Sequence, residues 1–166
     1  MAITTDIVHS WCRPRHVMRR LLDHGRREDR ALSYLLVACL LIYAAQWPRL
    51  QREAVLNPGD APLEAQLAII FFAMLMIWPI LLYALGGLTH LIALALGGKG
   101  SWYSARLALF WSLLATTPAW LLHGLVSGMI GPGAAQVLVG AGLLLALLTI
   151  WGLTFFEAET APERKG

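Results

Sequence analysis

Thirty-two residues without a charge, almost all of them apolar, run from Ala65 to Leu96. At about 1.5 Å rise per residue, one helix of this length would measure roughly 48 Å, more than a hydrocarbon core of about 30 Å. We expect either one long bent helix or a crossing followed by a second, partial element. Pro79 is the expected kink, and Gly86-Gly87 is the expected break.

The composition is that of a membrane protein. Of the 166 residues, 58% are hydrophobic and only 14% are charged, against about 25% charged residues in ordinary soluble domains. The apolar residues fall in long blocks, which predicts an all-α, polytopic transmembrane helical bundle. The four expected crossings are residues 31–47, 65–96, 104–128 and 135–156. Pro48 is expected to end the first and Pro118 lies inside the third; five crossings, made by splitting the second or third block, are the alternative.

The basic residues predict the orientation of this bundle. With four crossings, eleven of the thirteen Lys and Arg residues fall on one side of the membrane, and only Arg49 and Arg52 fall on the other. Short loops rich in Lys and Arg stay in the cytoplasm. We therefore expect a multi-pass protein of a cell inner membrane with both termini cytoplasmic, including the charged tail of residues 157–166.

Residues 1–30 form a basic cytosolic segment that contains a predicted helix, "PRHVMRRLLDHG". Pro14 suits a first helical turn and Gly25 suits a C-terminal cap. Apolar residues repeat at helical spacing between them and the remaining face is rich in arginine. Two interpretations stay open: the helix lies on an anionic membrane surface, or it packs on the protein's own cytosolic face. Arginines arranged in this way on a helix favour binding to lipid headgroups over binding to nucleic acid.

A short cytosolic hairpin is predicted between the second and third crossings. Its residues are Gly97, Gly98, Lys99, Gly100, Ser101 and Trp102. The glycines end one helix, Ser101 caps the next, and Trp102 lies at the membrane interface. Arg106, one turn further on, is expected to extend back to the headgroups.

The segment "LALGGKGSWYSARLALFWSLLATTPAWLL" resembles the signature of the Yip (Ypt-interacting protein) family. The matching positions are Gly98-Lys99-Gly100-Ser101-Trp102, Trp111-Ser112-Leu113 and Pro118. The start of the chain is similar to short alphaproteobacterial members. The resemblance implies a polytopic helical membrane domain with a cytosolic N-terminus. Eukaryotic relatives bind small GTPases and reticulon-type proteins, but this chain lacks their long N-terminal region and their usual fifth crossing, so that role is not carried over.

No motif of a hydrolytic or phosphate-binding site occurs in the sequence. His90 and His123 are the intramembrane histidines, and their predicted depths differ by roughly 20 Å, so one haem does not bridge them. His9, Cys12 and His16 are too loosely spaced for a strong metal signal. No Asp or Glu lies inside a proposed crossing, so proton or cation relay is unsupported. We expect no catalytic residues, no metal and no cofactor.

The predicted function is therefore that of a non-catalytic inner-membrane protein associating with lipids or other membrane proteins. The expected docking residues are Arg13, Arg15, Arg19, Arg20, Arg26, Arg27, Lys99, Trp102 and Arg106. Gly140 and Gly142 offer a close-packing seam for a second copy. A small transporter or channel built on broken helices is the alternative, and a haem-binding membrane anchor is a distant third.

Overall fold

The computed structural model describes residues 3–57 and 62–160. The helices are α1 (Ile3–Cys12), α2 (Pro14–Asp23), α3 (Glu28–Leu56), α4 (Leu63–Phe72), the π-helical turn η1 (Ala73–Ile77), α5 (Trp78–Ala95), α6 (Trp102–Ala115), α7 (Thr117–Met129) and α8 (Ala134–Thr160). No strand occurs among the described residues. The predicted all-α fold is confirmed.

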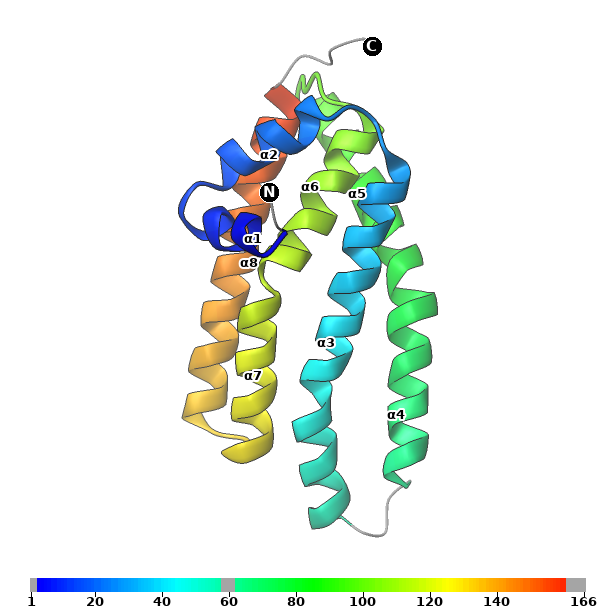
Figure 1. Ribbon diagram of the computed structural model, residues 1–166, viewed down its shortest axis with the longest axis vertical. Helices are drawn as coiled ribbons and strands as arrows, with labels where there is room; N and C mark the ends of the chain where they lie inside the picture. Colours follow the sequence, from blue (N-terminus) through cyan, green and yellow to red (C-terminus); the bar gives the residue numbers. More distant parts are fainter. Residues whose placement is uncertain (1–2, 58–61, 161–166) are drawn as a thin grey trace.

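Within the described residues, three helical stretches are long and apolar enough to cross a membrane: α3, the continuous run Leu63–Ala95, and α8. The pair α6 and α7, bent by 44°, supplies a fourth if it is counted as one span. The protein is a multi-pass helical bundle. We call the end where α3 begins and α8 finishes the basic end, and the opposite end, where α3 finishes and α8 begins, the far end (Figure 1).

The first span differs from the prediction at its end. α3 continues from Glu28 through Pro48 to Leu56, so the expectation that Pro48 ends the span is wrong. Proline removes one hydrogen bond from a helix and disturbs its packing, and neighbouring helices offset this cost in membranes. Here α7 packs directly on Pro48, because a Cβ added at Gly128 would lie 2.3 Å from the Cβ of Pro48.

The second span is one helical run with a π-helical turn. Gly86 and Gly87 lie inside α5, so the predicted break there is wrong. Their role is close packing instead: a Cβ at Gly86 would lie 2.8 Å from Cγ of Arg106, and one at Gly87 would lie 3.3 Å from Cζ3 of Trp102. The irregularity falls at η1, just before Pro79, where a wider turn accommodates the proline ring.

The third span is broken where the sequence predicts. α6 ends at Ala115 and α7 begins at Thr117, directly before Pro118. The hydroxyl of Thr117 donates to the carbonyl of Leu114 at 2.8 Å, and the indole Nε1 of Trp11 donates to the carbonyl of Ala115 at 2.9 Å. Carbonyls freed by a break must find donors inside a membrane. Two of them are therefore satisfied, one of these by α1.

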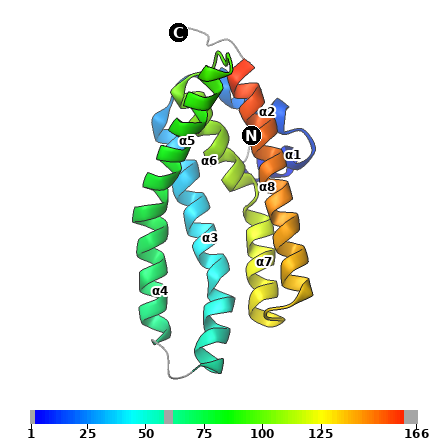
Figure 2. The same cartoon turned by 180° about the vertical axis from the view of Figure 1, so that it is seen from behind.

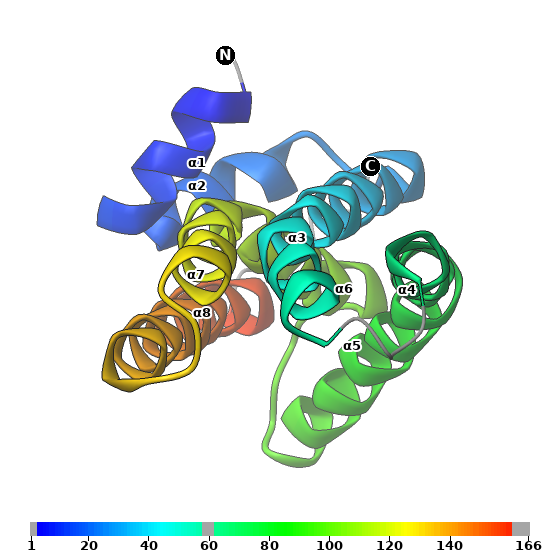
Figure 3. The same cartoon turned by 90° about the horizontal axis from the view of Figure 1, so that it is seen from below.

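α6 forms the centre of the bundle. Twelve of its fourteen residues are buried, and it packs against α3, α5, α8 and α1 (Figure 3). Phe110 and Trp111 are the largest fully buried side chains of the core. α4, by contrast, has no buried residue and packs on α3 at the side of the bundle. The core therefore surrounds a single short helix.

The closest helix contact joins α3 and α7 toward the far end. A Cβ at Gly124 would lie 1.9 Å from the carbonyl oxygen of Ala45. Gly124 and Gly128 stand four residues apart, the small-residue spacing that lets membrane helices approach closely. Gly140 and Gly142, the seam predicted for a second copy, lie on α8: Gly140 faces His123, and nothing lies within 4 Å of a Cβ added at Gly142.

Candidate functional site

The N-terminal hairpin, α1 with α2, packs on the outside of the bundle against α6 and α8 (Figures 1 and 2). Val17 and Met18 are fully buried and Leu21 is nearly so. Gly25, with φ +80°, follows the end of α2 as predicted. The structure agrees with the interpretation that this helix packs on the protein itself. Its apolar face is buried against the bundle and is not available to a membrane surface.

Among the described residues, Arg26 has an interaction partner, and four other predicted docking arginines pair with carboxylates. Arg19 lies 2.6 Å from the buried carboxylate of Glu157, Arg20 pairs with Asp6, and Arg27 lies 3.2 Å from Asp29. These three pairs anchor the hairpin and the turn that follows it. The fourth, Arg106, belongs to α6.

Arg106 lies 2.6 Å from Glu28 and also donates to the carbonyl of Trp102. Its guanidinium stands 5.3 Å from the ring centroid of Tyr83. That Arg106 extends back to the headgroups stays a prediction; in the structure α3 begins beside it and supplies a carboxylate.

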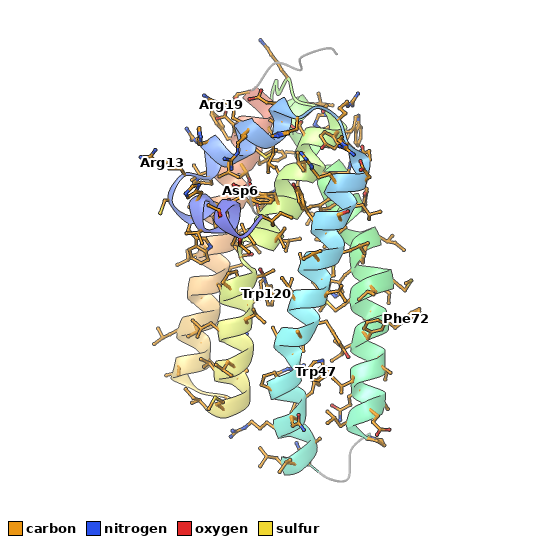
Figure 4. All side chains as sticks on the ribbon, viewed as in Figure 1. Asp6, Arg13, Arg19, Trp47, Phe72 and Trp120 are labelled. Carbon is orange, nitrogen blue, oxygen red and sulfur yellow. The ribbon has the colours of Figure 1, made fainter. Side chains whose placement is uncertain are left out.

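Arg13 and Arg15 differ from these four. They make no ion pair with another described residue, and both are exposed. The guanidinium of Arg15 stands 5.2 Å from the ring centroid of Phe156, which is 56% exposed on α8. Figure 4 shows Arg13 projecting outward from the turn between α1 and α2. These two charges are thus displayed at the outer surface beside α8.

Glu159 holds the loop between α5 and α6 to the end of α8. Its Oε1 lies 2.9 Å from Nδ1 of His90, and its Oε2 accepts from the backbone N–H of Gly100 at 3.1 Å. Its carbonyl accepts from the N–H of Lys99 at 3.0 Å. We call these four residues the Glu159 clasp. His90 and Glu159 are both buried.

The clasp explains the run of glycines before α6. A Cβ at Gly98 would lie 2.6 Å from Oε2 of Glu159, and one at Gly100 would lie 2.6 Å from the carbonyl of Ala158. Gly97 has φ +88°, a conformation that side chains disfavour. These glycines therefore serve close approach and a tight turn at the end of α5.

Ser101 and Trp102 continue this arrangement into α6. The Oγ of Ser101 accepts from the N–H of Ser104, and Oγ of Ser104 accepts from the N–H of Ser101, a reciprocal cap. The predicted cap is confirmed. The ring of Trp102 meets that of His90 edge to face at 5.0 Å and is half exposed. The predicted hairpin is thus held from α5, α6 and α8 together.

The other residues of the family-like pattern also lie in internal contacts. Nε1 of Trp111 donates to the hydroxyl of Ser10 at 2.9 Å, and the hydroxyl of Ser112 lies 3.0 Å from that of Thr154. All four of these residues are buried. Within the bundle they join α6 to α1 and to α8.

Sequence reasoning missed Glu157 and Glu159 by assigning both to a cytosolic tail that begins at residue 157. In the structure α8 continues to Thr160 and both carboxylates are buried. His90 was the signal in the sequence that a carboxylate lies nearby. It is an isolated ionisable residue in an apolar run, and such a residue needs a polar partner inside a membrane. Arg164 and Lys165 of the predicted tail lie outside the described residues.

The histidines lie in different surroundings. His90 belongs to the clasp, whereas His123 packs beside Gly140 on α8. His9, Cys12 and His16 do not gather into a cluster. No group of three or more His, Cys, Asp and Glu that could hold a metal ion occurs within residues 3–57 and 62–160.

In comparison with known proteins, no family model, curated protein or solved structure matches this chain. The resemblance to the Yip family stays a prediction from the quoted residues.

Proposed function

We propose that this is a non-catalytic, Yip-type protein of an inner membrane that associates with lipids or other membrane proteins through its basic end. One observation carries the proposal. The apolar face of α2 is buried on the protein, while Arg13 and Arg15 are displayed without a carboxylate partner in the described part of the chain. Exposed guanidinium groups beside a membrane-spanning helix attract anionic headgroups.

The distribution of charge supports a cytoplasmic basic end. Nine of the eleven Lys and Arg residues in the described part of the chain belong to the segments at this end, and only Arg49 and Arg52 lie toward the far end. Such an asymmetry is typical of the cytoplasmic side of inner-membrane proteins. Association with anionic lipid or with a partner protein is therefore expected on that side.

The ionisable groups of the basic end support a non-catalytic role. His90 and Glu159 are bound to each other, and Glu159 also holds two backbone N–H groups. Ser101 caps a helix. A catalytic pair needs a nucleophile or substrate within reach of its base, and these side chains are engaged in holding the loop.

Extraction of the full chain into native lipid particles tests the proposal. Lipids and proteins that co-purify are identified by mass spectrometry, and the particle mass is measured. We expect anionic lipid enriched over its share of the bulk membrane, or a stoichiometric protein partner. A monomer surrounded by lipid of bulk composition would contradict the association.

A small transporter is the second candidate, favoured by the 44° bend at Thr116 in the third span. Broken helices form the binding sites of many transporters. Against it, the hydroxyl of Thr117 and the indole of Trp11 already occupy two carbonyls at the break. Flux assays on reconstituted vesicles separate the candidates. We expect no solute movement above that of empty vesicles, and sustained flux would favour the transporter.

A further inference from the structure

A hollow of about 490 Å³ lies between the turn joining α1 to α2 and the side of α8. Its lining residues are Cys12, Arg13, Pro14, Arg15, His16 and Leu153. We call it the arginine notch. Two guanidinium groups and an imidazole surround it, while α8 contributes an apolar side chain. Its lining includes no carboxylate.

The charge of the notch is not paired with any carboxylate among residues 3–57 and 62–160. Arg19, Arg20, Arg27 and Arg106 have carboxylate partners. Arg13 and Arg15 form no ion pair with another described residue. Arg15 instead stands over the ring of Phe156. Two cations placed together without a counterion in the described part of the chain are complementary to an anion, and guanidinium groups match the geometry of phosphate oxygens.

An exposed strip along α8 leads from this place toward the far end. Its residues are Leu138, Gly142, Leu145, Thr149, Gly152 and Phe156. They stand three or four residues apart and therefore share one side of the helix. Leu138 and Leu145 are 72% and 66% exposed, and nothing lies within 4 Å of a Cβ added at Gly142 or Gly152. The strip is a mostly apolar surface continuous with the cationic notch.

We propose that the arginine notch binds the phosphate of one anionic phospholipid, whose acyl chains lie along the strip of α8. The guanidinium groups of Arg13 and Arg15 contact the phosphate oxygens, and Leu153 and Phe156 contact the glycerol end of the chains. This site rests on the proposed lipid association and identifies its ligand. A water-soluble phosphate compound would use the cations but not the strip.

The test uses the full chain in detergent with phosphatidylglycerol or phosphatidylcholine added, and native mass spectrometry counts the lipids retained. The double variant Arg13→Gln, Arg15→Gln removes the notch charges. The control Arg30→Gln, Arg49→Gln removes the same charge elsewhere. We expect one phosphatidylglycerol retained by the wild type, affinity lowered by about tenfold or more in the notch variant, and a change of less than about twofold in the control.

The outcomes distinguish the site from the function. Retention by the notch variant equal to that of the wild type, or an equal loss in the control, would overturn the site while leaving lipid association standing. Equal retention of phosphatidylcholine by the wild type would overturn the site together with the preference for anionic lipid on which it rests. Inorganic phosphate at the same concentration as the lipid should leave retention unchanged, because it contacts the cations but not the strip, and displacement by it would show that the strip contributes nothing. A circular dichroism melt matching that of the wild type verifies that the notch variant is folded.

Discussion

At the basic end, buried carboxylates join segments that are distant in the sequence, whereas at the far end α3 and α7 meet through the glycines of α7. Glu159 binds His90 and the loop before α6, and Glu157 binds Arg19 of the hairpin. Gly124 and Gly128 lie directly against Ala45 and Pro48. Polar contacts depend on charge and solvent, while glycine packing depends only on shape. The two ends should therefore respond differently to substitution and to salt.

The largest loss of stability is expected from a substitution that fills the contact between α3 and α7. Gly124→Leu places a side chain where a Cβ alone would lie 1.9 Å from a backbone carbonyl. Such overpacking costs about 3 kcal/mol or more, because backbone cannot yield as a side chain can. The melting temperature in detergent should fall steeply. Gly142→Leu, with nothing within 4 Å of its Cβ, is the matched control, and an equal fall in both variants would refute the seam.

The next effect is expected at the clasp. Glu159→Ala leaves His90 and the N–H of Gly100 without their carboxylate, at a cost of about 3 kcal/mol. We expect a lower melting temperature and faster protease cleavage in the loop between α5 and α6. Glu64→Ala, at an exposed carboxylate of α4, should change neither. Unchanged cleavage at the loop would mean that the clasp does not hold it.

A smaller effect is expected at the break in the third span. Trp11→Phe keeps most of the ring but removes the donor to the carbonyl of Ala115, which costs about 1 kcal/mol. Trp47→Phe is the control, because Trp47 is about as exposed as Trp11, 49% against 47%. Equal melting temperatures for the two variants would show that this carbonyl needs no indole.

The smallest effect is expected for the partly exposed ion pair of the hairpin. Arg19→Gln should lower the free energy of unfolding by about 1 kcal/mol or less, because the arginine side chain is 66% exposed. The loss should shrink at high salt. Gly124→Leu should show no such dependence. If the loss of unfolding free energy in Arg19→Gln does not depend on salt, the contact is not electrostatic, and the two ends of the bundle do not differ in their response to salt.

The sequence predicts most of the fold at the level of helices. The apolar blocks mark the three long apolar helices and the bent pair of α6 and α7, and Pro118 marks the break at Thr116. The prediction fails at Pro48 and at Gly86-Gly87, where tertiary contacts overrule local preference. α7 covers the proline, while Arg106 and Trp102 pack on the glycines. A residue that ends a helix in isolation is tolerated when a neighbouring helix packs on it.

The candidate site is less predictable, because charge pairing depends on which segments meet. The sequence identifies the arginines as a group but does not separate Arg19, which pairs with Glu157, from Arg13 and Arg15, which form no ion pair with a described residue. The pattern of residues 97–101 is visible, yet its partner Glu159 lies some sixty residues away. α1 has no clear signature, and its contact with the break follows only from the fold.

We infer a bundle of four crossings, with the N-terminal hairpin and the end of α8 on one side of the membrane. Single cysteines at His24, Asn57 and Thr160, in a background of Cys12→Ser and Cys39→Ser, are labelled with a membrane-impermeant maleimide in spheroplasts and in inverted vesicles. All three positions are exposed. We predict labelling of His24→Cys and Thr160→Cys only in inverted vesicles, and of Asn57→Cys only in spheroplasts. Labelling of Thr160→Cys together with Asn57→Cys in spheroplasts would require an odd number of crossings and would contradict the account.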